Sequence, residues 1–130
     1  KEVPAHVASR LQAALWREAI HLVLEGVASV EDIDKAVVHG PGLRWSVMGP
    51  HMLFNLASGG KGMEVFIERF GPSFSVWWDS LGHPDLTPET ASILAEGCRA
   101  EENGRSFEAL SAERDEKLVA VLKQFNTSEK

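Results

Sequence analysis

The sequence is poor in residue types that several classes of protein require. Its 130 residues include one cysteine, Cys98, and no tyrosine. A single cysteine cannot build a disulfide framework within the chain, so a reducing compartment such as the cytoplasm is expected. No segment approaches the ~18 uncharged apolar residues of a membrane span, and no secretory pattern is recognised. We therefore expect no membrane association.

Basic residues are also scarce. Lys and Arg number 13 against 19 Asp and Glu, which gives a net charge of −6. Recognition of nucleic acid or of an anionic membrane needs clustered positive charge, so neither partner is expected. The glycine fingerprints of nucleotide sites are missing: Gly60 and Gly62 are followed by Val65 where a third glycine would fall. The five histidines lack zinc-site spacing, so no metal is expected.

The pattern that is present is helical. Period-2 alternation and Asn-Gly or Asp-Gly hairpin turns are absent, whereas apolar residues recur at three- and four-residue spacings. The first such segment runs from about Pro4 to Gly26 and predicts a helix of about 20 residues, roughly 30 Å long. That helix is long for so small a domain. Because the chain opens on Lys1 without an initiator methionine, we expect a piece of a longer protein.

Local signals divide the rest of the chain into further helices. Ser29, Pro50 and the pair Thr87-Pro88 are typical of helix starts. Gly71-Pro72 is interpreted as a helix end, and Cys98 as a small buried residue on an inner face. The expected helices cover about 30–38, 50–57, 63–70, 74–81, 88–102 and 106–125, with a loop over 43–49. We predict an all-α domain of about seven helices over residues 1–125, followed by a polar tail over 126–130.

The loop over residues 40–50 is the most informative stretch for function. It combines glycine and proline with Arg44, Trp45 and Met48. Arg44 is suited to hold a carboxylate in a bidentate pair, and Trp45 to face a quaternary ammonium. The alternative is structural: Trp45 fills the core and Arg44 pairs with a surface carboxylate.

Two adjacent tryptophans, Trp77 and Trp78, form a second candidate feature. One ring must point away from the other, so one is expected in the core and one at a partner or substrate surface. Residue types alone leave both interpretations open.

Several runs resemble the C-terminal domain of the 3-hydroxyacyl-CoA dehydrogenase family. They are Arg10-Leu11, Glu18-Ala19, Glu25-Gly26-Val27-Ala28-Ser29, Asp32-Ile33-Asp34-Lys35-Ala36 and Met48-Gly49-Pro50. Further runs are most similar to its L-carnitine dehydrogenase-like branch: Ala14-Leu15-Trp16-Arg17-Glu18-Ala19, Gly42-Leu43-Arg44-Trp45, Gly62-Met63 and Phe70-Gly71-Pro72. The resemblance covers nearly the whole chain.

The resemblance implies a fold and a role. The fold would be the multi-helix domain of the 6-phosphogluconate dehydrogenase C-terminal-like type, with a long first helix. The domain would complete a substrate cleft and form a homodimer, while an N-terminal Rossmann domain outside this chain would bind NAD and supply the catalytic pair. The full-length protein would oxidise a 3-hydroxy acid, carnitine-like or an acyl-CoA, to a 3-keto product, and the fragment alone would be inactive.

The resemblance also suggests site residues, with one departure. The family's run Gly-Phe-Ile/Val-x-Asn-Arg aligns with Ala5-His6-Val7-Ala8-Ser9-Arg10, so Ser9 stands at the position of the assisting asparagine. The candidate substrate-binding residues are Ser9, Arg44, Trp45, Met48, Trp77 and Trp78. No cofactor or metal ligand is expected in this domain. The alternative is a non-catalytic helical module for dimerisation or scaffolding.

Overall fold

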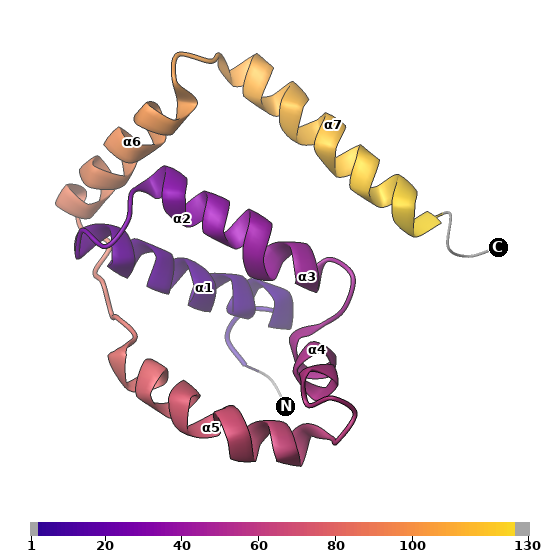
Figure 1. Ribbon diagram of the computed structural model, residues 1–130. Coiled ribbons are helices and arrows are strands. Elements are labelled where there is room, and N and C mark those ends of the chain that lie inside the picture. The colour runs from indigo at the N-terminus through magenta and orange to yellow at the C-terminus, as the bar shows by residue number, and fades with distance from the viewer. Residues whose placement is uncertain (1–2, 127–130) are drawn as a thin grey trace.

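The computed structural model describes residues 3–126, and this part of the chain contains helices and no strand (Figure 1). The helices are α1 Val7–Leu24, α2 Val30–Val37, the π-helical turn η1 Val38–Gly42, α3 Leu43–Trp45, α4 Pro50–Ala57, α5 Met63–Ser80, α6 Pro88–Glu102 and α7 Phe107–Asn126. The prediction of an all-α domain with a long first helix is confirmed. Of the predicted polar tail, Asn126 ends α7 and residues 127–130 lie outside the described residues.

The first packing unit consists of α1, α2 and α6. Ile20 on α1 is 3% exposed, and a turn with Gly26 at φ +67° leads the chain into α2. The Ser29 hydroxyl accepts the Asp32 amide at 3.1 Å, which caps α2 as predicted. Gly97 on α6 approaches α2 so closely that a Cβ there would lie 2.3 Å from Val30 Cγ2. The absence of a side chain at Gly97 is what allows this contact.

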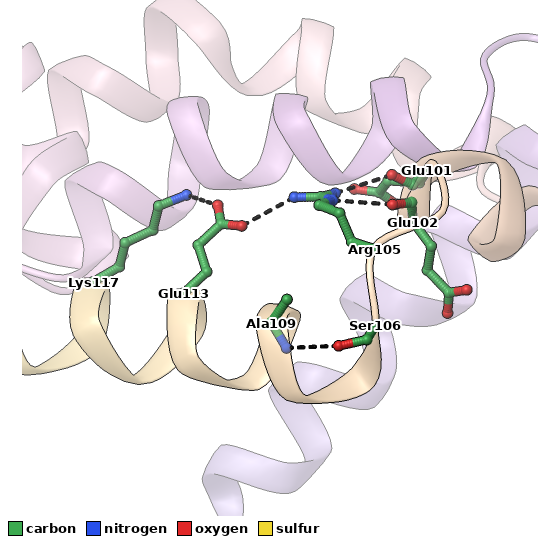
Figure 2. A network of polar contacts seen from close by, with 7 residues as sticks. All are labelled: Glu101, Glu102, Arg105, Ser106, Ala109, Glu113 and Lys117. Atoms are coloured by element: carbon green, nitrogen blue, oxygen red, sulfur yellow. Dashed lines mark hydrogen bonds and ion pairs between the residues drawn. The ribbon is translucent and has the colours of Figure 1, made fainter.

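A network of polar contacts, shown in Figure 2, connects the C-terminal end of α6 to α7. Arg105 donates to the carbonyl oxygens of Glu101 and Glu102, both at 3.0 Å, and so satisfies groups that the helix end leaves open. The same guanidinium reaches Glu113 on α7 at 3.0 Å, and Lys117 pairs with that carboxylate. In the view of Figure 1, the ribbon of α7 is separated from those of α1, α4 and α5.

Three local predictions are wrong. Residues 63–80 form one helix, α5, rather than two helices separated at Gly71-Pro72. Proline at position 72 fits helical φ and removes one hydrogen bond, a loss that packing of the helix can offset. Part of the predicted loop over 43–49 is helical, because α2 continues through η1 into α3 with a kink at Gly40. Cys98 is exposed rather than buried.

Candidate functional site

The candidate site begins with the hairpin of α4 and α5. Pro50 occupies the first turn of α4, as its fixed φ favours. After α4, the Ser58 hydroxyl accepts the amides of Lys61 and Gly62, both at 3.0 Å, and donates to the Asn55 carbonyl at 2.6 Å. Gly62 has φ +95°, a conformation that disfavours any side chain. This turn brings α5 against α4.

Aromatic rings fill the contact between the two helices. Phe66, Phe70 and Phe74 recur every four residues on α5 and therefore lie on one face. The Phe54 ring of α4 stacks on Phe66, with centroids 4.9 Å apart, and meets Phe74 edge-on at 5.5 Å. Phe66 is 8% exposed, so it forms the floor of this cluster.

A cavity of about 560 Å³ lies over these rings. Its lining consists of Pro50, His51, Phe54, Met63, Phe66, Ile67, Gly71, Pro72, Phe74, Ser75 and Trp78. The only polar side chains among these residues are those of His51 and Ser75, and there is no Asp, Glu, Lys or Arg. The volume falls within the range of roughly 300–1,000 Å³ that is typical of small-molecule pockets. Apolar groups and aromatic faces therefore dominate what this cavity offers to a ligand.

Trp78 is the one predicted site residue that lines this cavity, and its side chain is 66% exposed. Its neighbour Trp77 packs on Phe74 at 5.0 Å, edge-on, but is not among the lining residues. Neither tryptophan is buried in the described structure, so the expectation that one fills the core is wrong.

The remaining predicted site residues lie on other elements. Arg44 and Trp45 form part of α3, and Trp45 is 41% exposed rather than a plug of the core. The Arg44 side chain makes no hydrogen bond or salt bridge within residues 3–126, so the predicted alternative of a surface ion pair is wrong there. Met48 is half-buried between α3 and α4, and Ser9 is exposed in the first turn of α1. In Figure 1 the start of α1, α3 and α4 lie at the same side of the view.

Sequence reasoning missed most of the cavity. Phe54 was not assigned to a site, and Phe66 and Phe74 were expected in the separate helices over 63–70 and 74–81. The signal that identifies them is the four-residue repeat Phe66, Phe70, Phe74 and Trp78, which continues across Gly71-Pro72 and requires one uninterrupted helix.

A set of polar contacts, separate from the cavity, connects α1 to the segment that precedes α6. Glu18 accepts the Gly82 amide at 2.9 Å, and Arg17 Nη1 lies 3.5 Å from His83 Nδ1. A Cβ at Gly82 would lie 2.0 Å from the His21 ring, so glycine is needed at this position. The Arg17 Nε is buried and has no hydrogen-bond partner among residues 3–126. These contacts fix the approach of the chain to α6.

The described residues contain no group of three or more His, Cys, Asp or Glu side chains that could hold a metal ion. Within the same part of the chain, no helix has the length and apolar character needed to cross a membrane.

Comparison with known proteins places this arrangement in a family. Residues 6–107 match the family model described as 3-hydroxyacyl-CoA dehydrogenase, C-terminal domain. The chain is 46% identical over 121 residues to an L-carnitine dehydrogenase of Bacillus cereus, an alignment that covers 93% of this chain and 37% of the relative. It is 48% identical over 122 residues to the L-carnitine dehydrogenase of Streptomyces coelicolor, covering 94% and 38%. An L-carnitine dehydrogenase of a Pseudomonas species is 44% identical over 128 residues, covering 98% and 40%.

The chain thus spans two fifths or less of the length of these relatives. The match over residues 6–107 includes α1 to α6 and the start of α7. The chain belongs to the family of 3-hydroxyacyl-CoA dehydrogenase C-terminal domains.

Proposed function

We propose that this chain is the substrate-binding and dimer-forming domain of an NAD-dependent 3-hydroxy-acid dehydrogenase, with L-carnitine as the first candidate substrate. The observation that carries the proposal is the identity of 44–48% to proteins named L-carnitine dehydrogenase, over more than nine tenths of this chain. The reaction would convert the secondary alcohol of the substrate to a ketone. The 3-hydroxyacyl-CoA and sugar-acid substrates are the competing members of the same class.

The chain's own residues would bind and orient the substrate. The exposed guanidinium of Arg44, without a partner in the described structure, is suited to donate two parallel hydrogen bonds to the substrate carboxylate. Ser9, in the first turn of α1, would donate a hydrogen bond to the substrate oxygen in place of the family's asparagine. Trp45, Met48 and Trp78 would supply apolar walls of the cleft.

The residues of this chain do not fit an NAD site. The glycine-rich strand-to-helix turn that cradles a pyrophosphate is missing from the sequence, and the described residues contain no strand to support one. NAD would bind to a domain outside this chain and accept the hydride there. The chain by itself would therefore be inactive.

Exposed apolar residues on α1 support the proposal that this domain packs against other domains or chains. Along the first half of α1, the exposed side chains include Val7, Leu11, Leu15 and Trp16, which are 37–71% exposed. Val7, Leu11 and Leu15 share one face at four-residue spacing, whereas Trp16 lies on another side of the helix. We propose that this face meets the nucleotide-binding domain and that α7 meets a second copy of the chain.

The test uses the product of the complete open reading frame that contains this sequence. NADH formation is followed with L-carnitine, short 3-hydroxy acids, a sugar acid and 3-hydroxyacyl-CoA as separate substrates. Turnover with L-carnitine or another of these hydroxy acids supports the proposal. Absence of turnover with the whole panel overturns it and favours the non-catalytic scaffold module.

A further inference from the structure

The cavity between α4 and α5 has an unusual combination of size and chemistry for a surface hollow. Aromatic rings from both helices line it, and none of its lining residues is Asp, Glu, Lys or Arg. A ligand held here cannot be recognised by a charge of the opposite sign. It must be recognised by apolar contact and by the negative faces of aromatic rings.

The same helix shows that one of its aromatic faces already accepts a cation. The Arg69 guanidinium lies over the Phe70 ring, with its central carbon 5.0 Å from the centroid. Phe70 is not among the cavity-lining residues, so this pair leaves the cavity itself unoccupied by a protein cation. The rings of Phe54, Phe74 and Trp78 remain to face a ligand.

Helix α5, which forms one wall of the cavity, carries more acidic than basic residues, a balance that favours a cation over an anion. Helix α5 carries Glu64, Glu68 and Asp79 against the single basic residue Arg69, and the whole chain has a net charge of −6. No lysine or arginine lines the cavity to repel a positive ligand. A fully methylated ammonium cannot donate a hydrogen bond, so aromatic faces can hold it without a hydrogen-bond acceptor directed at its charge.

We propose that the α4–α5 cavity binds the trimethylammonium group of the substrate, with Phe54, Phe74 and Trp78 as the recognising rings. This inference rests on the proposed function, which names a substrate that carries such a group. It identifies Trp78 as a specificity-determining residue. Its neighbour Trp77, which is 55% exposed and does not line the cavity, has no part in that recognition.

The test compares two ligands that differ in charge and share their shape. Choline and 3,3-dimethylbutan-1-ol each carry three equivalent methyl groups, on a nitrogen cation or on a neutral carbon. Their methyl resonances report binding to the complete open-reading-frame product in ligand-observed NMR titrations, without any need for turnover. We expect choline to bind about tenfold more tightly than the neutral alcohol, the preference that a desolvated cation–π contact provides.

Two substitutions of Trp78 serve as the test, and a substitution at a nearby exposed position of α5 serves as the matched control. Trp78→Leu should abolish the preference for choline, and Trp78→Phe should retain most of it because a ring remains. Val76→Ala, at an exposed position of α5 that does not line the cavity, should leave the preference unchanged. Since the Trp78 side chain is two thirds exposed, its replacement is not expected to unfold the domain.

The outcomes separate this inference from the proposed function. Equal binding of the two ligands, or an unchanged preference in Trp78→Leu, overturns the cation site even if L-carnitine is oxidised. A Trp78-dependent preference for choline without oxidation of L-carnitine would support the cation site and count against the dehydrogenase substrate proposed above.

Discussion

At the scale of single residues, Arg44 is the side chain whose surroundings are most suited to a carboxylate. It lies in the short helix α3, is exposed, and makes no polar side-chain contact within residues 3–126. An arginine without a partner in the protein can donate hydrogen bonds to a ligand from both of its terminal nitrogens.

Substitution of Arg44 by alanine should therefore weaken substrate binding. Loss of a charge-assisted pair corresponds to roughly 1.5–3 kcal/mol, so KM for L-carnitine should rise by about tenfold or more with a smaller change in kcat. Steady-state kinetics of the complete protein measure this change. Arg44→Lys keeps the charge but loses the bidentate geometry, so its KM should lie between those of the unmodified protein and Arg44→Ala. An unchanged KM in Arg44→Ala would exclude Arg44 from the substrate site.

Gly97 illustrates how a single missing side chain shapes the fold. At an open position in a helix, replacing glycine by alanine favours folding by up to about 1 kcal/mol. At Gly97 the new Cβ would lie 2.3 Å from Val30 Cγ2, so α2 and α6 must separate. We expect Gly97→Ala to lower the free energy of unfolding by about 1–3 kcal/mol, measured by chemical denaturation. The exposed Ser92→Ala change on the same helix should stay within about 0.5 kcal/mol, and a stabilised Gly97→Ala protein would contradict the close contact.

At the scale of elements, sequence signals were reliable where neighbouring residues decide the structure. Ser29 and Thr87 cap α2 and α6 through amides three residues away, at 3.1 Å in each case. The same reasoning failed at Gly71-Pro72, because local breaking signals there are overridden by packing of the α5 aromatic face on α4. It failed at Cys98 because periodicity gives the sides of a helix but not which of them another element covers.

In the candidate site too, local features were predictable from the sequence and contacts between helices were not. Trp78 was accessible to sequence reasoning as a large aromatic residue near a helix end. Phe54 and Phe74 were not assigned to a site, because their approach to within 5.5 Å depends on how α4 packs against α5. The relation of α3 to that cavity likewise depends on tertiary structure.

The junction of α6 and α7 depends on ionised Glu113. The hydrogen bond from Lys117, then the charge of Lys117 and that of Arg105, lower the pKa of Glu113 below the ordinary value of 4.5. A lowered carboxyl pKa contributes stability above the ordinary value, and that contribution disappears as the pH falls through the lowered value.

We therefore expect the junction to weaken in acid, below about pH 4.5. In urea denaturation at a series of pH values, Glu113→Gln should reduce the stability near neutral pH and show a smaller further loss in acid. Glu116→Gln serves as the control, because Glu116 on the same helix forms no salt bridge within the described residues. Identical acid sensitivity of Glu113→Gln and the unmodified protein would contradict a role for this carboxylate.

At the scale of the whole molecule, the described chain buries little of itself. Only Ile20, Phe66, Gly82 and Thr90 fall in the buried class among the described residues. Helix α7 exposes Leu118, Leu122 and Phe125, which are 40–54% accessible and recur at helical spacing. Such a face is what a helix presents to a partner surface.

If α7 forms the proposed interface between two copies, charges on that face should separate them. We expect the unmodified complete protein to sediment as a dimer and the double variant Leu118→Asp with Leu122→Asp to sediment as a monomer. Ala112→Asp adds a negative charge at another exposed position of α7 and should leave the dimer intact. A dimer that survives the double substitution would place the interface on another face.

The assignment of this domain to carnitine-type chemistry can be tested most directly by substrate preference. The measurement is kcat/KM for NAD reduction by the complete open-reading-frame product, with L-carnitine compared with 3-hydroxybutyrate, which lacks the trimethylammonium group. We predict that kcat/KM for L-carnitine is at least about tenfold higher, as expected if a cation contact stabilises the bound substrate. An equal or lower value for L-carnitine would contradict the proposed substrate, and no NAD reduction with either compound would contradict it as well.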